Sequence, residues 1–410
     1  MAKTISKGVI DPATYAADGC EGVLTFGLGM ISVLAGTGST TLLATLYGLP
    51  ISASHGVIGG LVAVGLASHG AESLGWEPLE QTVIAWVASP LLGGVTAALL
   101  HALIHSLVHS KPDPERRAQA LQPFFVAATV AVAIAFILIT GPSIIKVRPV
   151  SLAVLISCVG GVAVALVSMA IGRKGQQMQM MRSMAGPSQE RKAIRRDGMT
   201  SPELSDAESA AAGEQREAEA SMAAGSVLDQ AGDEAEKPFV PLLILSAMTV
   251  AFAHGGNDVG NSIGPLATIL DVVQGGDITA VPEIQWWVLL LGSCGFVVGI
   301  VLIGNRTIAT VGGKITTLTP SRSFAVQTGT AVAVLSSTVL GLAVSTSHCL
   351  VGAVIGVGIA GRLLGTGGEL NASMLKKIVI GWAATIPLAM LVSLIFFYVL
   401  SALYKGVECS

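Results

Sequence analysis

The sequence predicts an all-α, polytopic membrane protein, and three observations support this fold class. Of its 410 residues, 52% are hydrophobic and only 12% are charged, whereas a soluble domain has about a quarter of its residues charged. The apolar residues form runs long enough to cross a hydrocarbon core, which requires about 20 helical residues. Two apolar regions are interrupted by short polar turns that match each other. We therefore expect a lipid bilayer, and no nucleic acid, around this chain.

The first apolar region is predicted to be a helical hairpin at 24–67. Apolar segments at 24–47 and 56–67 flank a turn at 48–55 that contains Pro50 and several small polar residues. Non-helical backbone at membrane depth is tolerated only where it lines a cavity or is buried in protein. This pattern favours a re-entrant hairpin beside a site.

The remaining apolar runs predict full spans separated by one hydrophilic loop. The loop at 173–238 begins with a basic part, 173–196, and continues as an acidic part rich in Ala, Ser and Gly. Such a segment cannot bury a core, so we predict a disordered, cytosolic loop. Full spans are expected at about 80–109, 121–141, 149–172, 240–270, 284–304 and 377–404.

A duplication is visible within the chain. Leu340–His348 matches Tyr47–His55 without a gap, and in the same register Gly59 falls on Gly352. Internal repeats are typical of secondary transporters. The predicted organisation is a first repeat at 1–109, two connecting spans at 110–172, the loop at 173–238, and a second repeat at 239–410 with its hairpin at 323–361.

Charge predicts the orientation of these repeats. If the basic segment 173–196 is cytosolic, counting spans in both directions places the bases of the two hairpins on opposite sides of the membrane. This arrangement is an inverted repeat, whose sites are expected near the midplane, where the hairpin tips meet.

The stretch at 253–265 interrupts another apolar run with polar residues and glycines. An ionisable residue inside a span costs about 2.5–3.5 kcal/mol on insertion scales, so Asp258 is expected to face a cavity and to be functional. The flanking glycines and Pro265 predict a break in the helix that exposes backbone carbonyls and amides. A helix-packing seam would need the glycines, but it would not need Asn257, Asp258 and Asn261.

The segment Gly255-Gly256-Asn257-Asp258-Val259-Gly260-Asn261 resembles the G-A-N-D-V-A-N signature of the inorganic phosphate transporter (PiT) family. The resemblance extends over nearly the whole chain. It implies a twelve-segment inverted-repeat fold that carries inorganic phosphate with Na⁺ or H⁺, as a homodimer and without a resident cofactor. Ten segments are recognisable here, counting each hairpin as two. We therefore expect the family's first motif helix and the span after it to precede this chain.

The hairpin tips supply hydroxyl groups at helix starts, where free N–H groups and the positive end of the dipole favour an anion. No Lys or Arg lies inside an apolar segment, although an anion and Asp258 would both be negative. Burying these charges without cations would be prohibitive, so we expect cation symport. Oxygen ligands suit a hard cation such as Na⁺. The expected phosphate ligands are Ser52, Ser54, Asn257, Asp258, Ser345, Thr346 and Ser347, and the expected cation ligands are Asn257, Asp258 and Asn261.

The histidines allow two interpretations each. His55 and His348 directly follow the hairpin tips, where they would either carry protons or act as structural residues. His101, His105 and His109 share one helix face, which is a possible metal-binding spacing but is also ordinary for a polar rim. We expect no metal site. The five cysteines are scattered and predict neither a disulfide framework nor a zinc site.

Three alternatives remain open at this point. A sulfate carrier of the same fold would use the same donors, and a non-transporting paralogue would bind ligand only. An intramembrane hydrolase would use Ser345 or Ser347 with His348 and Asp258, but adjacent Ser and His on one turn do not face each other, so we expect no enzyme. The membrane is expected to be the plasma membrane, with an organellar membrane as the alternative.

Overall fold

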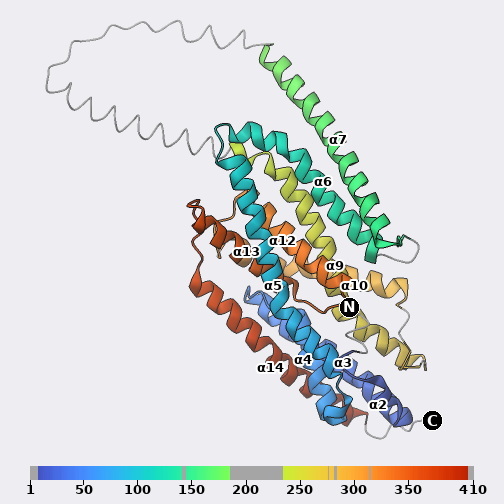
Figure 1. Ribbon diagram of the computed structural model, residues 1–410. Helices are drawn as coiled ribbons and strands as arrows, with labels where there is room; N and C mark the ends of the chain where they lie inside the picture. Colours follow the sequence, from blue (N-terminus) through green and yellow to red (C-terminus); the bar gives the residue numbers. More distant parts are fainter. Residues whose placement is uncertain are drawn as a thin grey trace, which may run out of the picture. The chain divides into compact units, whose positions relative to one another are not determined.

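The computed structural model describes residues 8–140, 145–184, 234–275, 277–280, 284–313 and 315–404. Within these ranges the chain is helical apart from short connections and one isolated β-bridge between Ile10 and Leu74. The chain divides into two compact units: Met1–His105 with Phe136–Val147 and Leu243–Ser410, and Ser106–Ala135 with Arg148–Leu242. Figure 1 shows the helices.

Eight helices of the described chain are long and apolar enough to cross a membrane, which confirms the all-α, polytopic prediction. These spans are Gly19–Leu46, Trp76–His109, Pro114–Ile139, Val150–Ala170, Phe239–Val273, Trp286–Ile308, Thr346–Leu363 and Ala372–Leu403. Two further helices, α4 (Ala53–Ser68) and α12 (Pro320–Val339), are the other arms of the predicted hairpins.

The first hairpin consists of α3 (Gly19–Leu46) and α4. Its turn places Gly48 at φ +68°, a left-handed conformation that glycine adopts without strain. The Ser52 side chain then caps α4 by accepting a hydrogen bond from the His55 backbone N–H at 3.2 Å. The helix α3 has 28 residues and is about 42 Å long. It begins at Gly19, before the start of the apolar segment predicted at 24–47.

The second hairpin, α12 and α13 (Thr346–Leu363), repeats this backbone. Gly341 has φ +73°, and Ser345 accepts from the His348 backbone N–H at 3.3 Å. Even the turn bonds correspond: Leu49 N donates to Ala44 O at 3.0 Å, and Leu342 N donates to Ser337 O at 2.9 Å. The duplication predicted from the sequence is therefore also present in the local structure.

Each hairpin packs against the long helix that follows the other one. α14 (Ala372–Leu403) contacts α3 and α4, whereas α5 (Trp76–Ile104) contacts α12 and α13 (Figure 1). Glycines allow the close approach: a Cβ at Gly352 would lie 2.3 Å from Pro90 O, and one at Gly59 would lie 3.1 Å from Ile386 O. Because each long helix packs on the hairpin of the other repeat, the two repeats pack closely against each other.

The helix that carries the polar motif is α9 (Phe239–Val273), and it runs without interruption for 35 residues. The predicted break at the glycines and Pro265 is therefore wrong. Each glycine disfavours a helix by only about 1 kcal/mol and Pro265 by about 3 kcal/mol, and tertiary context overrides such preferences.

The second unit contains most of α6 (Pro114–Thr140) together with α7 (Val150–Met184) and the chain leading into α9. Gln122 Nε2 donates to Pro238 O at 3.1 Å within this unit. The helix α7 continues through 173–184, which we predicted to be loop, because its Gln, Met, Arg and Lys residues are good helix formers. The remainder of the predicted disorder, 185–233, lies outside the described residues.

The cysteines differ from the prediction at one position. Cys20 is disulfide-bonded, although the spacing of the cysteines did not indicate a disulfide. Cys158, Cys294 and Cys349 are free.

The C-terminal part of the second repeat's second span departs from a regular α-helix. After α10 (Trp286–Gly299), a π-helical turn η4 (Ile300–Gly304) leads into α11 (Asn305–Gly313). Arg306 Nη1 then donates to Leu46 O at 2.5 Å, at the C-terminal end of α3. A cation at this end of a helix is favourable.

Candidate functional site

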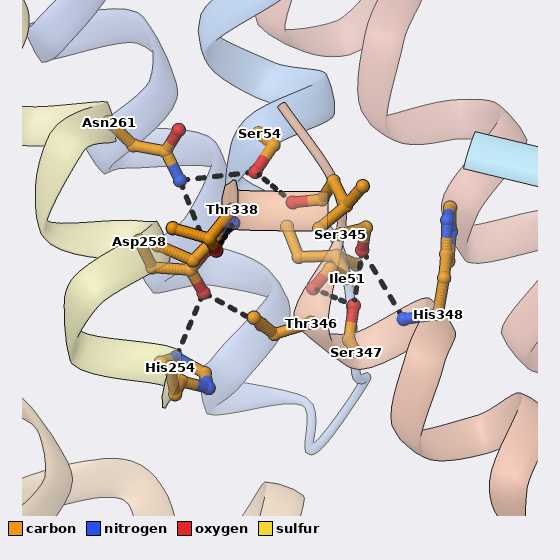
Figure 2. Close-up of polar contacts among 12 residues, drawn as sticks. Ile51, Ser54, His254, Asp258, Asn261, Thr338, Ser345, Thr346, Ser347 and His348 are labelled. Atoms are coloured by element: carbon orange, nitrogen blue, oxygen red, sulfur yellow. Dashed lines mark hydrogen bonds and ion pairs between the residues drawn. The ribbon is translucent and has the colours of Figure 1, made fainter. Parts of the chain in front are cut away.

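The polar motif of α9 faces the tips of both hairpins (Figure 2). His254, Asn257, Asp258 and Asn261 share one helix face because they lie three, four and seven positions apart. The three motif residues are buried, with exposed fractions of 0% for Asn257, 7% for Asp258 and 3% for Asn261. The structure thus brings together residues that the sequence separates by about 200 positions.

The Asp258 carboxylate uses its two oxygens unequally. Oδ2 accepts a hydrogen bond from Thr346 Oγ1 at 2.7 Å and lies 2.9 Å from His254 Nε2. Oδ1 has a long contact, 3.5 Å, to Asn261 Nδ2. It also accepts from the Asn257 amide at 3.1 Å when that amide is oriented to accept from Thr338. A carboxylate oxygen has two lone pairs, so Oδ1 can still accept a further ligand.

Asn261 leaves a second oxygen available beside the first. Its amide nitrogen donates to Ser54 Oγ at 3.1 Å, but its Oδ1 is buried without a hydrogen-bond partner among the described residues. A buried unpaired acceptor costs about 1–3 kcal/mol. Pro265 adds a third acceptor, since proline has no N–H to donate to the Asn261 carbonyl four residues earlier.

The two hairpin tips bind each other through symmetry-related bonds. Ser54 Oγ donates to Val344 O at 3.0 Å, and its counterpart Ser347 Oγ donates to Ile51 O at 3.2 Å. Ser345 Oγ lies 3.0 Å from Ser347 Oγ. All of the predicted tip hydroxyls lie at this junction except Ser52, whose recorded bond is the cap of α4.

His55 and His348, predicted to carry protons or to be structural, lie directly behind the tips. Their ring centroids are 4.5 Å apart, and their ring nitrogens have no hydrogen-bond partner among the described residues. Trp86 packs on His55 at 3.8 Å between centroids, and Trp382 packs on His348 at 3.7 Å. Both histidines thus lie in one row of tilted and edge-on aromatic contacts.

Two residues of the site were missed by the sequence analysis. His254 contacts Asp258, and its position four residues earlier on the same helix was the available signal. Thr338 lies at the C-terminal end of α12, with its Oγ1 3.1 Å from the Asn257 amide. No local motif marks Thr338, so only the tertiary structure reveals it.

The described residues do not form the alternative sites considered above. Ser345 Oγ is bonded to the backbone N–H of His348 and not to its imidazole, so no nucleophile and base are paired. Within the described ranges no three His, Cys, Asp or Glu side chains gather closely enough to hold a metal ion. His109 instead lies 3.7 Å from Glu236.

The electrostatic balance of the site indicates the class of protein. No Lys or Arg of the described chain donates to the motif or tip side chains, so the Asp258 carboxylate has only neutral donors and His254. A buried carboxylate, free acceptor oxygens and hydroxyls from two helix starts can hold a small cation beside an anion. In a multi-pass membrane protein built from a repeat, this site is typical of a secondary transporter.

Comparison with known proteins identifies the family. The Phosphate transporter family matches residues 1–393. The chain is 29% identical to a putative phosphate permease of Haemophilus influenzae over 406 residues, covering 99% of this chain and 84% of the relative. It is 33% identical over 412 residues to inorganic phosphate transporter 2-1, chloroplastic, of Arabidopsis thaliana, covering 99% and 64%.

A solved structure agrees with this result. The protein described as the sodium-dependent phosphate transporter matches with a TM-score of 0.72 at 29% identity, covering 98% of this chain and 84% of that one. The chain therefore belongs to the Phosphate transporter family. It is a multi-pass membrane phosphate permease and not an enzyme.

Proposed function

We propose that this permease couples phosphate uptake to sodium, with both ions bound where α9 meets the hairpin tips. The observation that carries the proposal is the Asn261 Oδ1 atom, buried without a hydrogen-bond partner among the described residues, beside an Asp258 carboxylate that no Lys or Arg of the described chain neutralises. Oxygen ligands of this kind suit a hard cation. The solved sodium-dependent relative supports the choice of Na⁺.

Phosphate would bind next to this cation, at the tips. The hydroxyls of Ser54, Ser347 and Thr346 now donate to Val344 O, Ile51 O and Asp258. An anion that enters between the tips would replace these acceptors, and the starts of α4 and α13 would add backbone N–H groups. Ser52 and Ser345 keep those two helix starts in place through their caps.

The arrangement in the membrane belongs to the same proposal. The hairpins would be re-entrant and would enter from opposite faces, as an inverted repeat with its site near the midplane. The matching backbones of the two turns support this arrangement. The family resemblance also implies a homodimer, which cross-linking of the purified protein in membranes would test.

A proton is the second candidate for the coupling ion. The observation that favours it is the 2.9 Å contact between His254 Nε2 and Asp258 Oδ2, because an imidazole paired with a carboxylate can take up a proton. In this case His254, and not the oxygens of Asp258 and Asn261, would respond to the driving gradient.

The experiment is uptake of labelled phosphate into proteoliposomes that contain the full chain. Inward gradients of Na⁺, of choline at equal ionic strength, and of protons are compared, with unlabelled sulfate as competitor. We expect accumulation with the Na⁺ gradient and weak competition by sulfate. Accumulation driven by the proton gradient alone would replace Na⁺ by H⁺, and equal uptake in all three conditions would contradict the coupling.

A further inference from the structure

Four aromatic rings lie in a row behind the site, one tryptophan and one histidine from each repeat. Trp86, His55, His348 and Trp382 follow one another with centroid separations of 3.8, 4.5 and 3.7 Å. Pro50 corresponds to Ala343, and Trp86 corresponds to Trp382 once three inserted residues are allowed in the second repeat. The hydrogen bonds of the two tryptophans nevertheless differ.

Trp382 is bonded to the first hairpin turn, whereas Trp86 is not bonded to the second. Trp382 Nε1 donates to Pro50 O at 2.9 Å. Trp86 Nε1 is buried without a hydrogen-bond partner among the described residues. The symmetry-related acceptor for Trp86 is Ala343 O, in a residue that is itself fully buried. A buried donor without a partner destabilises the state in which it occurs.

The bonds between the tips and the caps, in contrast, occur in both hairpins. Ser54 to Val344 O and Ser347 to Ile51 O are both formed, at 3.0 and 3.2 Å. The caps by Ser52 and Ser345 are also both formed. The two turns therefore have matching tip bonds and caps, and they differ in the hydrogen bond from the tryptophan.

We infer that Trp86 and Trp382 are positioning residues that select between the two facing states of the transporter. This inference rests on the proposed inverted repeat. If two repeats are related by a pseudo-two-fold axis in the membrane plane, exchanging their conformations turns the access path to the other side. The present state has the Trp382–Pro50 bond, and the opposite state has the Trp86–Ala343 bond in its place. The two histidines between the indoles keep both indoles beside the turns in either state.

The test uses a matched pair of substitutions that keep the ring and remove only the N–H. Trp382→Phe removes a bond of the present state, and Trp86→Phe removes a bond of the opposite state. Each should shift the ratio of the two states by about 2- to 12-fold, the change produced by one net hydrogen bond, but in opposite directions. The double variant Trp86→Phe/Trp382→Phe loses one bond in each state, so its ratio should return to within about twofold of the wild type.

The readout is amide hydrogen exchange of the two turns, 47–51 and 340–344, in the full-length protein reconstituted in lipid. We expect the 47–51 turn to exchange faster in Trp382→Phe, slower in Trp86→Phe, and at nearly the wild-type rate in the double variant. Tryptophans that only fill space would loosen the protein in both single variants and most in the double variant.

Changes in the same direction, or no change in Trp86→Phe, would overturn the inference. Phosphate uptake by the wild type is measured in the same preparation. Failure of that uptake would contradict the proposed function, whereas the exchange rates report the facing states whether or not phosphate is carried.

Discussion

The two hairpins of this protein share a backbone but contact the motif helix differently. Thr346, at the start of α13, donates directly to Asp258 at 2.7 Å. The corresponding residue of the first hairpin is Ala53, which has no hydroxyl, so Ser54 contacts α9 through Asn261 instead. Equivalent turns therefore present different chemistry to the same carboxylate: one hairpin binds the charged residue, and the other binds its amide neighbour.

This comparison separates the groups that the fold requires from the groups that are specific to the site. The glycine turns and serine caps occur in both hairpins because any helix–turn–helix of this shape needs them. The donor to Asp258 occurs in only one hairpin, so the turn itself does not require it. The predictions below separate these two kinds of residue.

The largest effect is expected from Asp258→Asn. The substitution keeps the shape and removes the charge that we assign to the cation, so sodium-driven phosphate uptake should fall by at least ~100-fold, since interactions with a charged group are worth about 1.5–3 kcal/mol each. Insertion into the membrane should be normal because a neutral residue is easier to insert. Asp271→Asn on the same helix serves as the control. Uptake with unchanged Na⁺ dependence would remove Asp258 from the cation site.

A smaller effect should follow from making the second hairpin resemble the first. Thr346→Ala removes the donor that Ala53 lacks, and the apparent KM for phosphate should rise by about 10-fold or more, because a hydrogen bond to a charged group is lost. Thr346→Ser retains the hydroxyl and should remain near wild type. Conversely, Ala53→Thr should leave uptake within about threefold. If Thr346→Ala has the KM of Thr346→Ser, the asymmetry has no role in binding.

The tip hydroxyls allow a comparison between symmetric positions. Ser54→Ala and Ser347→Ala each remove one bond between the tips and one candidate phosphate donor, and each should weaken phosphate binding by about 1–3 kcal/mol. Ser54→Ala should have the larger effect, since it also leaves the Asn261 amide without its acceptor. Equilibrium binding of labelled phosphate to the purified variants measures both. Unchanged affinity in both variants would place the anion elsewhere.

The smallest effect, and the most symmetric one, is expected for the caps. Ser52→Ala and Ser345→Ala should each destabilise the protein by about 1 kcal/mol, the usual contribution of a serine N-cap. Because the two caps have nearly equal geometry, 3.2 and 3.3 Å, thermal unfolding in detergent should give similar shifts. Clearly unequal shifts would mean that one of these serines has a role beyond capping.

Much of the fold could be predicted because its signals are local. Span-length apolar runs and the matching turns at 47–55 and 340–348 marked the helices and the repeat. The predicted inverted repeat placed the motif of α9 close to the hairpin tips. The contacts of Asp258 with Thr346 and of Asn261 with Ser54 agree with this prediction. The roles of these residues in binding stay predictions.

The features that were missed depend on tertiary packing. A few glycines and one proline predicted a break in α9, but helix propensity is a weak prior that tertiary context overrides. The packing of α5 on the second hairpin and of α14 on the first leaves no trace in local sequence. For the same reason the bonding difference between Trp86 and Trp382 could not be read from their matching positions.

The most direct test of the central claim is reciprocal binding of sodium and phosphate to the purified protein. If both ions share the site at Asp258, saturating Na⁺ should raise phosphate affinity, and saturating phosphate should raise Na⁺ affinity by the same factor, about 5- to 150-fold for couplings of this type. In Asp258→Asn the factor should fall to about one. Equal phosphate affinity with and without Na⁺ in the wild type, or an undiminished factor in the variant, would contradict the shared site.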